Sequence, residues 1–239
     1  MKGELVGQIK GVCVGRVGEI KTGRRSIKTA FVKEPIGDAV PLTTLGFDGD
    51  EHTYEDHGGP DMAVLLYPIE HYTYWAELGI DLPELGAFAE NLTVSGLAET
   101  DVNIGDVFQV TSPRLDPESK PVRLQVCQPR SPCYKIAARY GRKDLPALVQ
   151  ETGFIGYLAR VLSEGDVAAG DSLQLVERTS SISVTEAGRI ANVDRNDYDG
   201  ARRILDIETL GSSTRVTLEA RLKEKAELGL HTARLVLPD

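Results

Sequence analysis

Short runs rich in β-branched and aliphatic residues recur along roughly the first three quarters of the chain, and Gly, Pro and Asp separate them. This pattern is typical of strands that end in tight turns. Strands are predicted at residues 5–14, 27–32, 64–67, 92–94, 107–111, 122–126 and 172–176. Many short strands with few helices favour a mainly β fold, either a β-barrel or a strongly bent sheet, over a doubly wound fold.

Two helices and one long loop interrupt the strands. The first helix begins near Pro68 and carries apolar residues spaced three and four apart on one face: Ile69, Tyr72, Trp75 and Ala76. A second, shorter helix is predicted near residues 145–150. Residues 112–120 (SPRLDPESK) are predicted to form a hairpin loop.

After about residue 177 the hydrophobic period changes from that of strands to that of helices. Ser183 and Glu186 match a capping box, in which both side chains bind free backbone amides at a helix start. Asp199 is predicted to cap a second helix that ends at Gly211. A third helix is predicted from about residue 213 to near residue 229. The chain is therefore divided into a β domain, residues 1–177, and a three-helix domain, residues 178–239.

Composition limits the class of protein. The chain has 239 residues, 41% of them hydrophobic, as expected of a globular protein. It has no recognisable signal peptide and no apolar stretch of about 18 residues, so we expect neither export nor a membrane span. An odd number of cysteines, three, argues against a disulfide framework, and the predicted location is the cytoplasm.

The charge distribution argues against nucleic-acid binding. The net charge is -9, and an acidic surface repels phosphate backbones. Residues 178–239 hold ten basic and ten acidic side chains, so they offer no basic recognition face. Within the acidic portion lies one basic island, formed by Lys21, Arg24, Arg25 and Lys28. This island is interpreted either as a solvated hairpin turn or as a local anion site.

Cys133 is the main candidate for chemistry. It lies in the run QPRSPCYK, residues 128–135, where Pro129 and Pro132 fix two φ angles and remove two amide donors. Neither a regular helix nor a central strand tolerates both prolines well. The cysteine is therefore expected on a stiff, irregular segment that follows the strand at residues 122–126.

Neighbouring cations strengthen this interpretation of Cys133. Arg130 and Lys135 are close in sequence, and cations lower the pKa of a thiol toward the thiolate, which attacks electrophiles and binds metals. The alternative is a buried, inert thiol. We keep that alternative for Cys13, which lies in an apolar run, and for Cys127, which ends a strand.

Two polar motifs precede the cysteine segment. His57 begins the run HGGPD, which predicts a tight turn. Its imidazole can act as an acid or a base, donate a hydrogen bond to an anion, or simply be satisfied by a neighbour. His52 and His71 are interpreted as structural or exposed. Glu90 and Asn91 precede a strand, where an acid and an amide can orient a ligand or merely mark a loop-to-strand transition.

Common metal and nucleotide motifs are missing from the sequence. Cys127 and Cys133 are separated by five residues and two prolines, and His52 and His57 lie about 70 residues upstream, so no pair has the spacing of a zinc finger. Neither GxxxxGK[ST] nor GxGxxG follows a predicted strand. Zinc and phosphate-loop chemistry are therefore disfavoured.

Taken together and in order, these motifs resemble a MOSC domain of the YiiM-like branch. The resemblance is carried by GFDGDE at residues 46–51, HGGPD at 57–61, ENL at 90–92, GD at 105–106 and QPRSPCYK at 128–135. The helical tail resembles the three-helix extension of this branch. Two positions depart from the family pattern: Met62 replaces a basic residue that commonly follows HGGPD, and Ala89 replaces a glycine that often precedes ENL.

The resemblance implies a twisted β-barrel-like fold and a molybdenum cofactor, in which a pterin dithiolene holds the metal. It implies that Cys133 is the protein's metal ligand, and a soft thiolate suits such a metal. It further suggests Lys21, Arg25 and Arg130 for the anionic end of the cofactor and Asn91 for orienting cofactor or substrate. Pyridoxal phosphate binding is associated with the family as well.

The same resemblance implies an oxidoreductase that reduces small N-hydroxylated compounds, including hydroxylamino-purine base analogues. Nothing in the chain resembles a flavin, haem or iron–sulfur site, so an external electron-donor reductase is expected as partner. Cys133 and His57 are the expected catalytic residues, and His57 is expected to relay a proton. Resemblance to this branch also suggests a homodimer.

Three alternatives remain open at this point. The first is a cofactor-free thiol enzyme with Cys133 as nucleophile and His57 as base. The second is a noncatalytic carrier of sulfur or of the molybdenum cofactor, loaded on Cys133. The third is a binding module that acts through residues 178–239.

Overall fold

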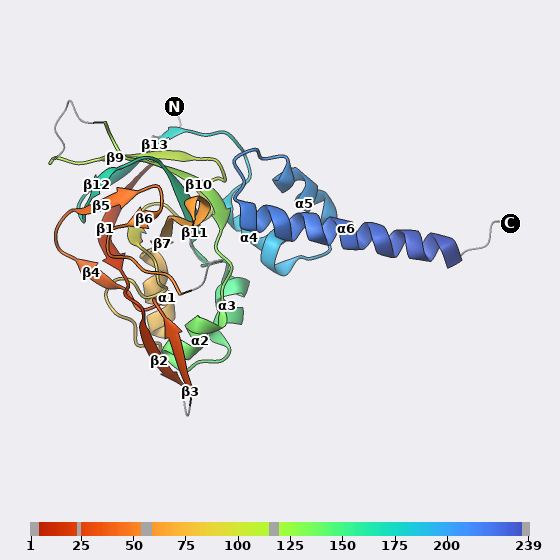
Figure 1. Ribbon diagram of the computed structural model, residues 1–239, viewed down its shortest axis with the longest axis horizontal. Helices are drawn as coiled ribbons and strands as arrows, with labels where there is room; N and C mark the ends of the chain where they lie inside the picture. Colours follow the sequence, from red (N-terminus) through yellow and green to blue (C-terminus); the bar gives the residue numbers. More distant parts are fainter. Residues whose placement is uncertain (1–4, 23–24, 54–58, 115–119, 236–239) are drawn as a thin grey trace.

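Seven strands close into a barrel in the computed structural model, which describes residues 5–22, 25–53, 59–114 and 120–235 (Figure 1). Around the barrel the order is β13 (Ser172–Glu177), β9 (Val107–Thr111), β10 (Arg123–Pro129), β11 (Tyr157–Ser163), β7 (Val64–Pro68), β8 (Leu92–Ser95) and β1 (Val6–Val14). Pairing of β1 with β13 completes the ring, and only β7 and β8 run parallel among these pairs. The predicted mainly β, barrel-like fold is confirmed.

Side-chain alternation explains why these segments close on one another. Alternate residues of β1 are buried, and β11 shows the same alternation although it was not predicted as a strand. Its sequence, YLARVLS, places Tyr157, Ala159 and Val161 on the buried face, so a period of two was present in the sequence. These side chains fill the inside of the barrel.

Smaller sheets flank the barrel. β2 (Gly18–Thr22) and β3 (Arg25–Thr29) form a hairpin, and β12 (Gly165–Val167), β5 (Val40–Thr43) and β6 (Gly46–Phe47) form a three-stranded sheet. β4 (Glu34–Ile36) pairs with β1 outside the ring. The strand predicted at residues 27–32 is thus displaced toward the hairpin. The predicted hairpin loop joins the paired strands β9 and β10, with residues 115–119 outside the described part of the chain.

Three helices pack beside the barrel: α1 (Glu70–Glu77), α2 (Tyr134–Tyr140) and α3 (Leu145–Thr152). α1 and α3 match the predicted helices, whereas α2 was not predicted. A second hydrophobic cluster anchors these helices, and it includes Trp75 of α1, Ile136 of α2 and Val149 of α3. Because α2 begins directly after Cys133, this cluster also fixes the cysteine segment.

The helical extension comprises α4 (Val184–Gly188), a π-helical turn (Arg189–Val193), α5 (Tyr198–Leu205) and α6 (Ser212–Leu235). The capping box at α4 is confirmed in part, because the Ser183 hydroxyl accepts a hydrogen bond from the Glu186 amide at 3.1 Å. None of the helices in the described ranges is both long and apolar enough to cross a membrane.

Three predictions about this extension are wrong. Asp197, not Asp199, caps α5, because its carboxylate accepts from the Gly200 amide at 2.8 Å. Gly211 precedes α6 instead of ending α5. α6 is 24 residues long and continues through Gly229, since one glycine inside a helix costs only about 1 kcal/mol.

The extension packs directly on the barrel. Buried residues from both parts, among them Val184, Ile204 and Leu218 of the extension and Val126 of β10, belong to one hydrophobic cluster. Figure 1 shows α6 starting against the barrel and projecting away from it. The boundary between residues 177 and 178 stays a prediction. The packing brings the start of α6 to the edge of the cavity described next.

Candidate functional site

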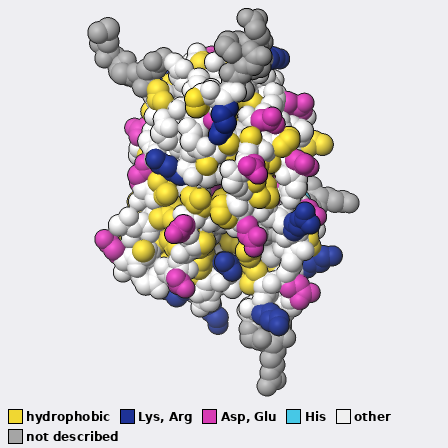
Figure 2. Space-filling view, turned by 90° about the vertical axis from the view of Figure 1, so that its left-hand side faces the viewer, with side chains coloured by type: hydrophobic (Ala, Val, Ile, Leu, Met, Phe, Trp, Pro, Cys, Tyr) yellow, Lys and Arg dark blue, Asp and Glu magenta, His cyan; other side chains and the backbone are white. Residues whose placement is uncertain are grey.

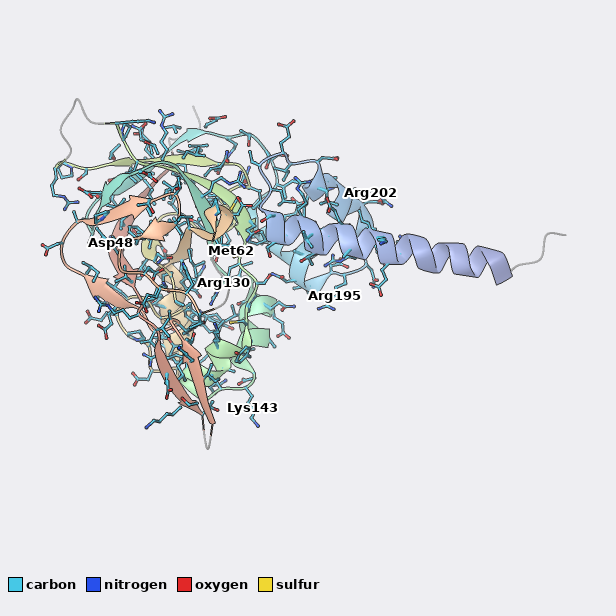
Figure 3. All side chains as sticks on the ribbon, viewed as in Figure 1. Asp48, Met62, Arg130, Lys143, Arg195 and Arg202 are labelled. Carbon is cyan, nitrogen blue, oxygen red and sulfur yellow. The ribbon has the colours of Figure 1, made fainter. Side chains whose placement is uncertain are left out.

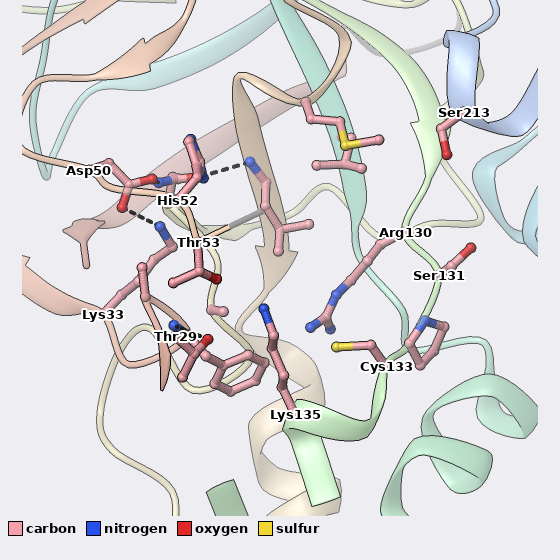
Figure 4. A pocket seen from close by; sticks show the side chains of 18 of the residues that line it. Thr29, Lys33, Asp50, His52, Thr53, Arg130, Ser131, Cys133, Lys135 and Ser213 are labelled. Atoms are coloured by element: carbon pink, nitrogen blue, oxygen red, sulfur yellow. Dashed lines mark hydrogen bonds and ion pairs between the residues drawn. The ribbon is translucent and has the colours of Figure 1, made fainter. Parts of the chain in front are cut away.

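A cavity of about 490 Å³ opens where the barrel, the cysteine segment and α6 meet (Figure 4). This volume lies in the usual range for small-molecule and cofactor sites. Five stretches of the barrel domain contribute to its wall, at residues 29–33, 50–53, 62–65, 89–91 and 128–135. Leu158 adds to the wall from β11, and Ser213 and Thr214 from α6. Segments distant in sequence therefore build one pocket.

Cys133 lies at the edge of this cavity, as the residue that precedes α2. Its backbone is extended, with φ -128° and ψ 166°, and its side chain is partly exposed. The irregular segment predicted for it is thus confirmed for residues 131–133. The prediction that a strand would end before Pro129 is wrong, because β10 runs through Pro129, which pairs with Tyr157 at the last position of the strand.

Arg130 lies beside the cysteine. Its side chain is only 7% exposed, and Nη1 is buried with no hydrogen-bond partner among the described residues. Burial lowers the pKa of this guanidinium, and negative charge on Cys133 opposes that shift. Figure 4 shows the guanidinium next to the sulfur of Cys133. A buried cation with an unsatisfied donor is costly unless an anion or acceptor satisfies it, so the arrangement suits an anionic ligand.

Lys135 and Lys33 add two further buried cations to the wall. Lys33 forms an ion pair with Asp50, and burial lowers the pKa of this lysine while the carboxylate acts in the opposite direction. The sequence alone did not indicate this pair. Asp50 lay in a recognised motif, GFDGDE, but its partner is 17 residues away and on another segment.

Asn91 lines the cavity, but its amide is bound to the protein. Nδ2 donates to Asp50 Oδ2 at 2.8 Å and to the carbonyl of Cys13 at 3.3 Å, and Oδ1 accepts from the Leu65 amide at 3.1 Å. Its immediate effect is therefore to hold Asp50, which in turn pairs with Lys33. That Asn91 orients a cofactor or substrate stays a prediction.

The neighbouring residues form a tight loop. Glu90 is fully buried and accepts hydrogen bonds from the Phe88 amide at 2.8 Å and from the Thr93 hydroxyl at 2.9 Å, as well as from the Tyr72 hydroxyl. Ala89 has a φ of 65°, in the left-handed region. Glycine adopts this conformation without strain, whereas the Cβ of alanine makes it costly.

The other predicted site residues are not all at the cavity. His57 lies outside the described residues, as does the side chain of Arg25, whose backbone is in β3. Lys21 is exposed on β2 and does not line the cavity. Conversely, His52, which was interpreted as structural or exposed, is exposed and lines the cavity.

His71, Cys13 and Cys127 are buried and have structural roles. His71 is buried, with Nε2 2.7 Å from Glu99 Oε2, and it stacks on Phe154. Burial raises the pKa of the Cys13 and Cys127 thiols to about 12, so both stay protonated and inert at neutral pH.

The sequence of this chain matches that of one known protein family. Residues 53–174, which include the cysteine segment and much of the cavity wall, match the family described as MOSC domain. The chain belongs to the MOSC domain family.

Close relatives of this MOSC protein cover most of its length. It is 40% identical over 217 residues to the uncharacterized protein YflK of Bacillus subtilis, covering 90% of this chain and 93% of YflK. It is 38% identical to the protein YiiM of Escherichia coli, over 88% of this chain and 92% of YiiM. The crystal structure of YiiM from Geobacillus stearothermophilus superposes with a TM-score of 0.73 at 32% identity, over 90% of this chain and 99% of that one.

Another relative is much longer than this chain. A Gibberella moniliformis protein named "Reductase" is 32% identical over 190 residues, which are 76% of this chain and 32% of that protein. MOSC membership together with this relative supports an oxidoreductase-like role. Met62, the residue that follows the HGGPD motif, lines the cavity.

Proposed function

We propose that this MOSC protein is a molybdenum cofactor-dependent reductase of small N-hydroxylated compounds, such as hydroxylamino-purine base analogues. One observation carries the proposal: the partly exposed thiol of Cys133 and the buried Arg130 guanidinium, with its unsatisfied Nη1, lie side by side in a cofactor-sized cavity. A soft sulfur ligand beside an anion-binding cation suits a group that combines a metal with an acidic phosphate.

The cavity wall fits such a group. No cluster of three or more His, Cys, Asp or Glu side chains able to hold a metal exists in the part of the chain that the structure describes. A metal bound here would thus take Cys133 from the protein and its other ligands from the pterin dithiolene. Arg130 and Lys135 would bind anionic oxygens, while Phe31 and Leu65 offer apolar surface to a flat ring.

Other residues have supporting parts in this proposal. Lys21 and Arg25, on the β2–β3 hairpin, stay candidates for the anionic end of the cofactor, although Lys21 does not line the cavity. Asn91 would act through Asp50, which it holds by a hydrogen bond. His57 would deliver protons to the leaving oxygen.

The reaction requires two electrons and two protons: R–NHOH + 2 e⁻ + 2 H⁺ gives R–NH₂ + H₂O. The bound cofactor supplies the redox-active metal, and the N–O bond is the bond that breaks. The electrons come from an external reductase. The name "Reductase" of one relative supports a reductive reaction.

Expression with and without host molybdopterin synthesis tests the proposal. Molybdenum content and reduction of 6-hydroxylaminopurine with reduced methyl viologen are measured on both preparations. We expect bound metal and activity only from the cofactor-competent host, and loss of both in Cys133→Ser. Cys127→Ser is the matched control, because that thiol is buried and does not line the cavity.

Equal turnover from both hosts would contradict the proposal. Turnover that needs no metal but is abolished by alkylation would instead support a thiol enzyme. Stoichiometric loading of Cys133 without turnover would support a carrier.

A further inference from the structure

A second cleft lies between the cysteine segment and the helical extension. Its volume is about 630 Å³. Ser131 and Pro132 line both this cleft and the main cavity, so the loop that leads to Cys133 separates the two. The remaining wall comes from the π-helical turn, the segment that joins it to α5, the first residue of α5, one face of α6 and Gln150 of α3. Its charged residues are Arg195, Arg221, Glu224 and Lys225.

The cleft gathers basic side chains that lack acidic partners. Three other arginines of the extension are neutralised, by ion pairs of Arg189 with Asp194 and Asp197, of Arg202 with Asp199 and of Arg203 with Glu186. By contrast, Arg195, Arg221 and Lys225 form no ion pair with any carboxylate that the structure describes, and Glu224 is the only acidic residue in the cleft wall.

Contacts with the protein hold two of these cations in the cleft wall. Arg221 donates to the carbonyls of Ile190 and Ala191, both at 2.7 Å, which fixes its guanidinium at the π-helical turn. Burial lowers the pKa of Arg221, and the positive charge of Arg195 adds to that shift. Asp194 opposes that shift, but its carboxylate is paired with Arg189. Lys225 lies over the ring of Tyr198, 3.5 Å from its centroid. An excess of positive charge in the cleft wall favours a partner that brings negative charge.

The opposite side of the molecule has a different character. Figure 2 shows the barrel from the side away from the helices, and there acidic and basic side chains are interspersed. Figure 3 places Arg195 in the helical extension, beyond the barrel residue Arg130. In a chain of net charge -9, the cleft is therefore a local positive site next to the loop of Cys133.

We propose that this cleft is the docking surface for the acidic face of the electron-carrier protein that reduces the site. The inference rests on the proposed function, which requires an external donor. A protein surface fits better than a small ligand, because Arg195, Glu224 and Lys225 are exposed, whereas small-ligand sites enclose most of their ligand. Complementary charge speeds such transient encounters, and their interfaces are small.

Docking here would bring the donor to the cysteine loop. Ser131 Oγ donates to Asn192 Oδ1 at 2.9 Å, and Asn192 Nδ2 donates to the Arg130 carbonyl at 3.4 Å. A carrier seated on Ser131 is therefore separated from Cys133 by Pro132 alone along the chain. Two electrons pass from the reduced carrier per turnover, the carrier is oxidised, and the N-hydroxyl substrate is reduced to amine and water.

The test compares two donors on the cofactor-loaded protein. Arg195→Glu/Lys225→Glu is assayed with reduced flavodoxin, an acidic protein donor, and with reduced methyl viologen, a small one. We expect the KM for flavodoxin to rise about tenfold or more, with viologen turnover within about twofold of wild type. Raising KCl from about 50 to about 300 mM should raise the wild-type KM for flavodoxin and affect the variant much less.

Arg202→Glu/Arg203→Glu is the matched control, because it makes the same charge change in the same extension outside the cleft. This control variant should change the KM for flavodoxin less than about twofold, because salt screens the effect of charges that lie outside the docking surface. Unchanged flavodoxin kinetics in the cleft variant, or an equal loss with viologen, would overturn the inference.

Direct binding separates this inference from the proposed function. Biolayer interferometry with cofactor-free protein measures flavodoxin binding even if no turnover occurs. Weaker binding to the cleft variant than to the control variant supports docking, and equal binding rejects it. Inorganic phosphate or AMP that binds the cleft in NMR titrations, without flavodoxin binding, would assign the cleft to a small anion instead and would also reject the inference. Absence of viologen turnover in wild type would contradict only the proposed function.

Discussion

The Asp61 carboxylate accepts a hydrogen bond from the backbone amide of Ser212, with Oδ2 2.8 Å from the nitrogen, across 151 residues of sequence. Asp61 is the last residue of the HGGPD motif, and Ser212 begins α6. The other carboxylate oxygen pairs with Arg160 Nη2 at 2.8 Å. One side chain of a site motif thus caps the helix that completes the cavity wall.

Replacing Asp61 tests this link. Asp61→Ala removes the helix cap and a partly buried ion pair, and we expect the free energy of unfolding to fall by about 2 kcal/mol. Asp61→Asn keeps an acceptor for the Ser212 amide and should lose less. Urea unfolding gives both values. Equal losses in the two variants would mean that the charge, not the cap, stabilises this contact.

Thiol reactivity should distinguish the three cysteines. Cys133 is partly exposed, whereas Cys13 and Cys127 are buried with thiol pKa values raised to about 12. Iodoacetamide at pH 7.5 should therefore modify Cys133 alone in the folded, cofactor-free protein, and all three in urea. Peptide mass spectrometry identifies the sites. Modification of Cys127 at a rate similar to that of Cys133 would contradict the burial of this thiol.

The left-handed conformation of Ala89 predicts a stabilising substitution. Ala89→Gly relieves strain at φ 65° but adds flexibility to the unfolded chain, so we expect a net gain of about 0.5–1 kcal/mol. Thermal unfolding should show a rise of about 2–4 °C per kcal/mol for a chain of this size.

Gly86→Ala, in the same loop, should have the opposite effect. Gly86 has φ 72°, and an added Cβ would lie 3.0 Å from the Lys33 carbonyl oxygen. A lower melting temperature for Ala89→Gly would show that the loop tolerates alanine without strain.

Buried thiols should make the fold sensitive to alkali. The pKa of Cys127 is raised by burial from its ordinary 9.0 to about 12, so the folded protein retains a proton that the unfolded chain has lost. The free energy of unfolding should therefore fall as pH rises from about 9 toward 12, by up to about 1.4 kcal/mol per pH unit for this thiol.

Cys127→Ala isolates this effect, because other groups titrate equally in both proteins. Urea unfolding at pH 8, 9 and 10 should show a shallower decline for the variant. Parallel curves would mean that Cys127 does not titrate differently in the folded and unfolded states.

Asn192 should control the mobility of the cysteine loop. It accepts from Ser131, donates to the Arg130 carbonyl, and its own carbonyl accepts from Gln150 Nε2 at 2.6 Å. Asn192→Ala removes the two side-chain contacts, so we expect faster alkylation of Cys133, by several-fold, and a loss of about 1–2 kcal/mol in stability.

Asn196→Ala serves as control, since Asn196 lines the cleft without a side-chain bond to that loop among the described contacts. Mass spectrometry follows the alkylation rate of Cys133 in both variants. Identical rates in the two variants would exclude a positioning role for Asn192.

The local pattern of apolar and capping residues determined most of the secondary structure of this protein. Alternating apolar residues predicted most barrel strands, and the capping residue Ser183 predicted α4, because period and caps depend on neighbours in sequence. The proline-flanked Cys133 was recognised for the same reason, as its backbone restraint is local. The segment of α2 was missed because it is short and lies beside prolines, and its buried face is formed by packing in the second cluster.

Only the tertiary structure decided which residues meet. Barrel closure puts Lys33 against Asp50, buries Arg130 with an unpaired donor, and sets Asp61 on the first turn of α6. It also leaves Lys21 outside the cavity, although its charge suggested a place within it. Such contacts depend on the order of the strands in the barrel and on how deeply each side chain is buried. Burial raises the free-energy cost of a charge. Neither strand order nor burial can be read from the spacing of residues along the chain.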